Sequence, residues 1–252
     1  MTRLKFSRLV LGAIALPLTL GLAACGGSED AGAQGNRDPI ETVAPPEGKA
    51  WTEIVAKTPE GGYRMGNPEA PIKLVEYGSL TCPHCAQFAA DSSEEIRGTF
   101  VESGRVSFEF RNFVMNPLDL TMAMLTRCGT PESYFALTEQ VFANQNTVIE
   151  TWSGLDEAAL NNAANQPPAT RYQAMAQLAG LPDFFASRGI SKDQAMTCLA
   201  DGASAESLVQ STQQQSEEFD ITGTPSFLVN GVKLDSNAWP EIKTRLENMG
   251  AR

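Results

Sequence analysis

The stretch that decides the fold is Leu74-Val75-Glu76-Tyr77-Gly78-Ser79-Leu80-Thr81-Cys82-Pro83-His84-Cys85-Ala86-Gln87-Phe88. Its beginning belongs to a short apolar run, 72–77, which predicts a buried strand. After the two cysteines, Phe88, Ile96 and Phe100 recur at helical spacing and predict a helix with one apolar face. The sequence therefore predicts a strand, a tight turn and a helix, with both cysteines where the strand gives way to the helix.

Cys82 and Cys85 form a Cys-x-x-Cys motif at the expected start of that helix. Unpaired backbone N–H groups and the positive end of the helix dipole stabilise an anion there, so the Cys82 thiol is expected to ionise more readily than a free cysteine. A thiolate is the nucleophile of disulfide exchange, and Cys85, one turn later and more buried, suits the partner that resolves a mixed disulfide. The same motif also occurs in half of a zinc site or in a chance pair of core cysteines.

A second stretch, Asp220-Ile221-Thr222-Gly223-Thr224-Pro225-Ser226-Phe227-Leu228-Val229-Asn230-Gly231, places Gly-Thr-Pro before a predicted strand and ends in an Asn-Gly hairpin signal. Together the two stretches resemble the thioredoxin superfamily and, within it, the DsbA-like thiol:disulfide oxidoreductases of the bacterial cell envelope. The resemblance extends over roughly 67–249. It implies an α/β protein: a thioredoxin fold with an inserted helical domain.

The resemblance also implies roles for individual residues. Pro83 and His84 form a dipeptide that often separates the cysteines in this family, and the His84 ring is expected to stabilise the thiolate; the alternative is an exposed turn residue without a role. Glu76, six residues before the first cysteine, matches a buried acid that accepts or supplies protons, and burial is expected to raise its pKa. Pro225 matches a cis-proline that packs against the cysteines, and the backbone beside Thr224 and Pro225 is expected to bind an extended substrate.

The order of patterns along the chain predicts five segments. They are a signal peptide (1–24), a lipidated N-terminus with a flexible tether (25–66), the first half of the core (67–117), a helical insertion (118–219) and the second half of the core (220–252). Helical spacing with breaks at 129–131, 166–168 and 180–182 predicts the insertion. Further strands are expected at 106–113, 226–229 and 232–234, and a last helix at 239–249. Apolar residues within 51–67 indicate a short preface that packs on the core.

The N-terminus has the features of an export signal. Arg3, Lys5 and Arg8 precede an apolar run, 9–22, that is too short for a comfortable membrane span. The run ends in Leu22-Ala23-Ala24-Cys25, which resembles the lipobox of bacterial lipoproteins, in which the cysteine is lipidated. We therefore expect a membrane-anchored lipoprotein on the periplasmic side of the cell envelope. Gly26 resembles an outer-membrane sorting signal, and the alternative is ordinary cleavage that leaves Cys25 as a free thiol.

Five cysteines in an exported chain leave one without a partner unless Cys25 is lipidated. With Cys82 and Cys85 paired by proximity, Cys128 and Cys198 remain for each other. A disulfide between them would close a loop of about 70 residues and stabilise the fold by roughly 4 kcal/mol. A second redox pair and a zinc site made by four cysteines are the alternatives, and the spacing favours neither.

The composition of the chain argues against several classes of function. The 252-residue chain has a net charge of -11, and removal of the three basic residues of the signal peptide makes it -14 (-11 - 3), which disfavours nucleic-acid binding. His84 is the single histidine, so a copper site with a second histidine is excluded, and a Ser-His-Asp hydrolase would need a histidine between two cysteines. Met115, Met122 and Met124 are interpreted as core residues rather than soft-metal ligands. No cofactor and no metal are expected.

These observations favour an enzyme that introduces disulfides into exported proteins through Cys82 and Cys85, because a stabilised thiolate makes the disulfide form a stronger oxidant. The expected partners are unfolded or reduced exported proteins and a membrane redox partner, and the expected state is a monomer. One alternative is a disulfide reductase or isomerase with the same pair, which the threonine before Pro225 favours. Another is a non-enzymatic peptide-binding module, although such a module has no need of the two cysteines.

Overall fold

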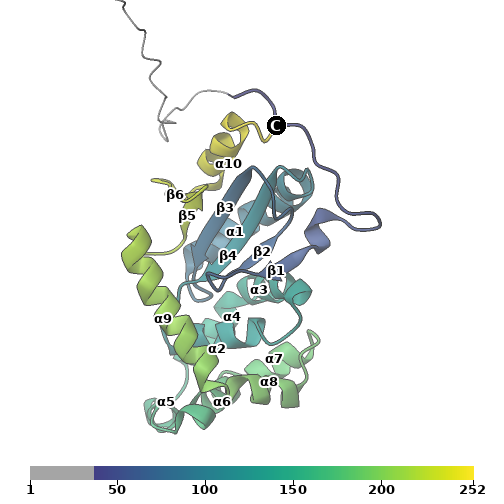
Figure 1. The fold of residues 1–252 in the computed structure, drawn as a ribbon. Coiled ribbons are helices and arrows are strands. Elements are labelled where there is room, and N and C mark those ends of the chain that lie inside the picture. Colours follow the sequence, from purple (N-terminus) through teal and green to yellow (C-terminus); the bar gives the residue numbers. More distant parts are fainter. Residues whose placement is uncertain (1–36) are drawn as a thin grey trace, which may run out of the picture. The chain divides into compact units, whose positions relative to one another are not determined.

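The computed structural model describes residues 37–252, so the expected signal peptide and the candidate lipidation site Cys25 lie outside the described residues. A mixed sheet forms the centre of this part, with strand order β1-β2-β4-β3-β5-β6 (Figure 1). The strands are β1 (Val55–Lys57), β2 (Tyr63–Met65), β3 (Ile72–Gly78), β4 (Val106–Asn112), β5 (Ser226–Val229) and β6 (Val232–Lys233). Strands from both ends of the chain therefore share one sheet.

The two central strands, β3 and β4, run parallel, with Glu76 opposite Phe110. Every residue of β4 is buried, as expected for a strand covered on both faces. On its other side β3 pairs antiparallel with β5, so that Glu76 also lies opposite Phe227. The hairpin from β5 to β6 turns at Asn230 and Gly231, whose φ angles of 50° and 81° suit the Asn-Gly pair that predicted it.

The crossover between β3 and β4 consists of α1 (Pro83–Glu95) and a π-helical continuation (Ile96–Val101). Phe88, Ile96 and Phe100 are all buried, which confirms the apolar face predicted from their spacing. The ring of Phe88 packs against that of Phe227, with 4.4 Å between their centroids. The C-terminal helix α10 (Trp239–Asn248) adds Trp239, which meets the rings of Phe88 and Phe100 edge-on. Aromatic packing thus fixes the helix that carries the cysteines on the sheet.

A helical region separates β4 from β5, as predicted. Its elements are α2 (Pro117–Thr126), a 3-10 turn (Pro131–Ser133), α3 (Tyr134–Ala143), α4 (Gln145–Ser153), α5 (Glu157–Ala164), α6 (Pro168–Leu178), α7 (Leu181–Ala186), α8 (Lys192–Leu199) and α9 (Gly202–Phe219). In Figure 1, α9 leads the chain back from the inserted helices to β5. The breaks predicted from Gly and Pro fall between α2 and α3, between α5 and α6, and at the start of α7. The α/β fold with a helical insertion is confirmed.

The tether expected over 25–66 needs a correction for its described part. Residues 55–57 and 63–65 are strands of the sheet, and β2 pairs with the free edge of β4. Residues 37–50 are also held, because the N–H groups of Arg37, Ile40 and Val43 donate to carbonyls of Asn248, Gly250 and Ser103 respectively. Pairing covers an edge that would otherwise expose backbone groups of β4. None of the helices in 37–252 is long and apolar enough to cross a bilayer.

Candidate active site

The two cysteines of the Cys-x-x-Cys motif lie at the start of α1, where the sequence placed them. Cys82 is the N-cap residue: its N–H donates to the carbonyl of Ser79, and its carbonyl accepts from the N–H of Ala86. Pro83 occupies the first helical position, where the missing N–H costs nothing. Both thiols are free, and Cys82 is 8% exposed whereas Cys85 is 0% exposed. An incoming sulfur can therefore reach Cys82 and not Cys85.

The surroundings of the two thiols shift their pKa values in opposite directions. A hydrogen bond from Cys85 is the main cause that lowers the pKa of Cys82 to about 5; burial opposes it, and hydrogen bonds with Thr224 and the backbone N–H groups of Cys85 and His84 add to it. Burial raises the pKa of Cys85, and the neighbouring Cys82 and Glu76 raise it further. At neutral pH the reduced pair therefore consists of a Cys82 thiolate and a Cys85 thiol.

Pro83 and His84 are both exposed at the beginning of α1. The backbone N–H of His84 is among the causes that lower the pKa of Cys82. This is the helix N-terminus acting directly on the sulfur, because the first N–H groups of a helix lack carbonyl partners within it.

The loop before β5 lies against Cys82. The peptide bond between Thr224 and Pro225 is cis. In its protonated form the Cys82 thiol donates to the backbone carbonyl of Thr224, with 3.2 Å between sulfur and oxygen. The hydroxyl of Thr224 in turn donates to the sulfur of Met115, 3.4 Å away. The structure thus brings Thr224 and Pro225, which lie more than a hundred residues further along the chain, to the reactive sulfur.

Glu76 is buried in β3, with 3% of its surface exposed. Burial raises its pKa well above the usual range for a glutamate, and the charge of Cys82 raises it further. Its Oε1 atom has no hydrogen-bond partner among the residues that the structure describes. A buried carboxyl group without a partner is expected to be protonated at neutral pH, because burial penalises the charged form.

A cavity of about 30 Å³ adjoins Glu76 between the sheet and the helices α1 and α3. Apolar rings, including that of Phe142, form much of its lining, together with the hydroxyl group of Thr138. That hydroxyl also has no partner within the described residues. Arg97 and Glu139 line the same cavity and form a partly exposed ion pair with a 2.7 Å separation. The volume suffices for about two water molecules, and the lining includes the partnerless oxygens of Glu76 and Thr138.

Comparison with known proteins agrees with this geometry. The family model described as "Thioredoxin" matches residues 58–248. The chain belongs to the thioredoxin family. It is similar to a crystal structure of a protein-disulfide isomerase from Novosphingobium aromaticivorans, with 34% identity, a TM-score of 0.68, and coverage of 73% of this chain and 96% of that chain. Wolbachia pipientis alpha-DsbA1 shares the fold, with 23% identity, a TM-score of 0.58, and coverage of 80% and 96%.

Among curated sequences, a Rickettsia bellii protein named as a protein-disulfide oxidoreductase is 25% identical over 202 residues, which cover 80% of this chain and 69% of the relative. For the similar protein of Rickettsia conorii, the match covers 62% of the relative. The chain thus spans about two thirds of the length of these relatives. The predicted thioredoxin fold with an inserted helical domain is confirmed, and this family member is a DsbA-like thiol:disulfide oxidoreductase.

Three residues near the cysteines were not expected to take part in the site. Met115 was interpreted as a core residue but is 57% exposed, because it lies in the loop between β4 and α2. Asp119 and Gln145 are buried and form hydrogen bonds with the turn that precedes α1. The sequence signal for Asp119 is limited to its place in the first turn of a helix that Asn116 caps. For Gln145 the sequence offers no signal.

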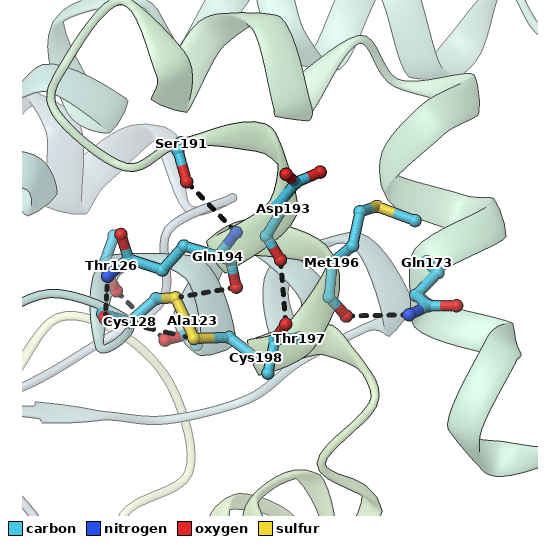
Figure 2. The surroundings of a disulfide bond; sticks show 10 residues. All are labelled: Ala123, Thr126, Cys128, Gln173, Ser191, Asp193, Gln194, Met196, Thr197 and Cys198. Atoms are coloured by element: carbon cyan, nitrogen blue, oxygen red, sulfur yellow. Dashed lines mark hydrogen bonds between the residues drawn. A yellow bond between two sulfur atoms is a disulfide. The ribbon is translucent and has the colours of Figure 1, made fainter.

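Cys128 and Cys198 form a disulfide between the end of α2 and α8 (Figure 2). Their Cα atoms are 5.8 Å apart, and 70 positions separate them in the sequence. The side chain of Gln194 spans the same junction, because its Nε2 atom donates to the carbonyl of Cys128 over 2.9 Å. The disulfide therefore lies inside the helical insertion of this thioredoxin-family chain. This pair joins the end of α2 to α8, whereas the reactive pair belongs to the start of α1.

Proposed function

We propose that this oxidoreductase works as an oxidase that introduces disulfides into exported proteins through Cys82 and Cys85. The observation that carries the proposal is the environment of Cys82, whose pKa is lowered to about 5 at the N-terminus of α1. Whatever stabilises the thiolate stabilises the reduced protein, so the disulfide form becomes a stronger oxidant. Cys82 is also the more exposed of the two cysteines, which supports its sulfur as the atom that substrates attack.

The reaction runs in two exchange steps. A substrate thiolate attacks the Cys82 sulfur of the oxidised protein, the Cys82–Cys85 bond breaks, and Cys85 leaves as a thiolate. A second substrate thiolate then attacks the substrate sulfur of this mixed disulfide, so the substrate gains a disulfide and Cys82 leaves as a thiolate. Two electrons have moved from the substrate to the cysteine pair. The low pKa of Cys82 makes it a good leaving group in this second step.

Cys85 needs a proton when it leaves, because burial raises its pKa. Glu76 is a suitable donor, since its own pKa is raised by burial and it interacts electrostatically with Cys85. The adjoining cavity, with the hydroxyl of Thr138 in its wall, supports re-protonation of Glu76 from the solvent side. We assign to Glu76 the role of a proton reservoir for the buried thiol.

Substrates are proposed to bind in extended form beside Thr224 and Pro225. This loop precedes the hairpin formed by β5 and β6, and it contacts Cys82 directly. Backbone hydrogen bonds of the strand type recognise a peptide with little dependence on its side chains. Loose specificity of that kind suits a range of unfolded exported proteins.

The proposed setting is the periplasmic side of the cell envelope, with the protein anchored by a lipid on Cys25 and working as a monomer. The support is the sequence Leu22-Ala23-Ala24-Cys25 after an apolar run. An oxidase in this setting requires a membrane redox partner that reoxidises the pair Cys82 and Cys85, because each catalytic cycle leaves the pair reduced.

A disulfide isomerase or reductase that uses the same residues is the second candidate. The similar protein from Novosphingobium aromaticivorans is named as a protein-disulfide isomerase. In an isomerase the reduced form starts the reaction, and the Cys82 thiolate attacks a substrate disulfide. The two candidate functions therefore differ in whether Cys82 and Cys85 are oxidised or reduced in the envelope. The reduction potential of this pair decides between them.

The test is the reduction potential of the soluble domain in graded glutathione buffers, with the state of Cys82 and Cys85 followed by alkylation. An oxidase should have a potential well above the glutathione poise, whereas a value near that of thioredoxin, about -270 mV, would overturn the oxidase proposal in favour of a reductase. Cys82→Ser should abolish catalysed thiol oxidation of a reduced model protein. Full activity of that variant in cells would instead indicate a peptide-binding module.

A further inference from the structure

Buried polar side chains of the helical insertion contact the active-site turn, and the first of them is Gln145. Gln145 is the first residue of α4 and is 3% exposed. Its Nε2 atom donates to two carbonyls of the turn, those of Leu80 and Cys82, each over 2.9 Å. Both donor hydrogens of the amide are thus used, and both acceptors belong to the residues on either side of Thr81.

A second buried side chain of the insertion contacts the same turn. Asp119, in the first turn of α2, accepts from the N–H of Leu80 over 2.8 Å with Oδ1 and from the N–H of Met115 over 2.9 Å with Oδ2. Leu80 is therefore held on its N–H by Asp119 and on its carbonyl by Gln145. Because both side chains are buried, a movement of the turn would leave polar groups without partners, which is costly in a protein interior.

The position of this turn decides the reactivity of the adjacent cysteine. Cys82 is the N-cap residue of α1, so the backbone conformation of the turn decides whether its sulfur lies beside the first N–H groups of the helix. The carbonyl of Cys82 begins the helix by accepting from Ala86, and Gln145 donates to that same carbonyl. Gln145 therefore acts on the residue that joins the turn to the helix.

We propose that Gln145 is a positioning residue for thiol:disulfide exchange: it holds the turn from Leu80 to Cys82 so that the Cys82 sulfur lies at the N-terminus of α1. In this way the inserted helical domain takes part in the chemistry of the thioredoxin-type core. The inference rests on Cys82 being the exchanging thiol, as proposed above. Gln145 touches no reacting atom, so its effect acts through the geometry of the cysteine.

The test substitutes Gln145→Met, which keeps the length of the side chain and removes both donors. The matched control is Gln173→Met, because Gln173 Nε2 also donates to a backbone carbonyl, that of Met196, over 2.7 Å, but within the insertion. We expect Gln145→Met to raise the pKa of the Cys82 thiol by about one unit, the shift that corresponds to one ordinary hydrogen bond. Ultraviolet absorbance of the thiolate against pH measures this shift in the reduced protein.

The rate of Cys82 alkylation near pH 6 should fall several-fold in Gln145→Met, because less thiolate is present, and should stay at the wild-type value in Gln173→Met. A folded Gln145→Met protein whose thiolate titrates like the wild type would overturn the inference. An equal shift in Gln173→Met would also overturn it, since a general loosening of the insertion would then be the cause.

Gln145→Asn serves if Gln145→Met does not fold. Its shorter side chain keeps the amide but cannot reach both carbonyls, so the same rise in pKa is expected, and an unchanged titration would overturn the inference. Measurement of exchange by the wild-type protein distinguishes a failure of the proposed function from a failure of the positioning role. Absence of exchange in the wild type contradicts the proposed function, whereas normal exchange with an unaltered Gln145 variant contradicts only the positioning role.

Discussion

Two buried carboxyl groups near the cysteines, Glu76 and Asp119, differ in their hydrogen bonds. Asp119 accepts two backbone N–H groups, and burial still raises its pKa to about 6. Glu76 has an oxygen without a partner and faces a small cavity. A carboxyl group such as that of Asp119, which accepts hydrogen bonds from the backbone, can hold a turn in place. A carboxyl group such as that of Glu76, which has an oxygen without a partner, can transfer a proton. The two residues therefore take different roles although both are buried.

The raised pKa of Glu76 should be visible in how the stability of the protein depends on pH. In the unfolded chain a glutamate ionises near pH 4.3, whereas burial raises the pKa of Glu76 in the fold, so unfolding releases a proton at pH values between the two. The contribution of Glu76 to the free energy of unfolding is therefore lost as pH rises from about 4 towards the pKa of this residue in the folded protein. Glu76→Gln should have a higher Tm than the wild type at neutral pH, with a difference that shrinks towards pH 4.

The measurement is Tm against pH on the oxidised protein, in which Cys82 does not titrate. Glu150→Gln, at an exposed position of α4, is the control and should follow the wild-type profile. A Tm difference between Glu76→Gln and the wild type that stays constant over the whole pH range would contradict a raised pKa of Glu76.

Individual site residues could be predicted where a short motif carries them. Cys82 and Cys85 belong to one motif, and Pro225 belongs to another, because each role depends on its immediate neighbours in the chain. Gln145 could not be predicted, since its acceptors lie 65 and 63 residues earlier in the sequence. A glutamine at a helix start is common, and only the folded arrangement gives it two carbonyls of the active-site turn.

At the scale of elements, long buried strands were predictable and short edge strands were not. The strands β3 and β4 have seven residues each, long enough to show an apolar run or an alternation, whereas β1 and β2 have three each. Three residues do not establish an alternation of apolar and polar side chains. β2 is formed because β4 offers it an edge, with Tyr63 opposite Phe110. The first part of the sheet therefore depends on tertiary pairing rather than on a local pattern.

The contact between α2 and α8 gives a prediction for the insertion. Cys128→Ser combined with Cys198→Ser removes a crosslink that spans 70 positions, so the free energy of unfolding should fall by about 4 kcal/mol and the Tm by about 10 °C. The alkylation rate of Cys82 should stay unchanged, because the disulfide lies within the insertion and away from the turn that Gln145 holds.

Thermal unfolding and Cys82 alkylation of that double variant, side by side, make the measurement. The control is Cys82→Ser with Cys85→Ser, which keeps the crosslink and should abolish exchange. A double Cys128 and Cys198 variant that keeps its Tm but loses exchange would show that the second pair relays electrons and is not structural.

At the scale of the whole molecule, the segment before the first strand packs on the folded domain. Residues 37–50 are bound to the C-terminal segment and to the loop at Ser103, so residues well before 67 belong to the folded domain. In the sequence, eleven residues, 26–36, separate Cys25 from Arg37. A chain of that length spans at most about 40 Å. A lipid on Cys25 would therefore confine the active site to the neighbourhood of one membrane, and that membrane would decide which redox partner it meets.

Lipid anchoring can be tested by Cys25→Ser in a bacterial host, with Cys82→Ser as the matched control. The first variant should move from the membrane fraction to the soluble fraction and should fail to incorporate labelled palmitate, because the thiol that accepts the lipid is gone. The second should stay with the membrane, because it alters only the exchanging thiol. If both variants partition alike, Cys25 does not anchor the chain; if both are soluble, the protein diffuses freely and could reach a redox partner in either membrane.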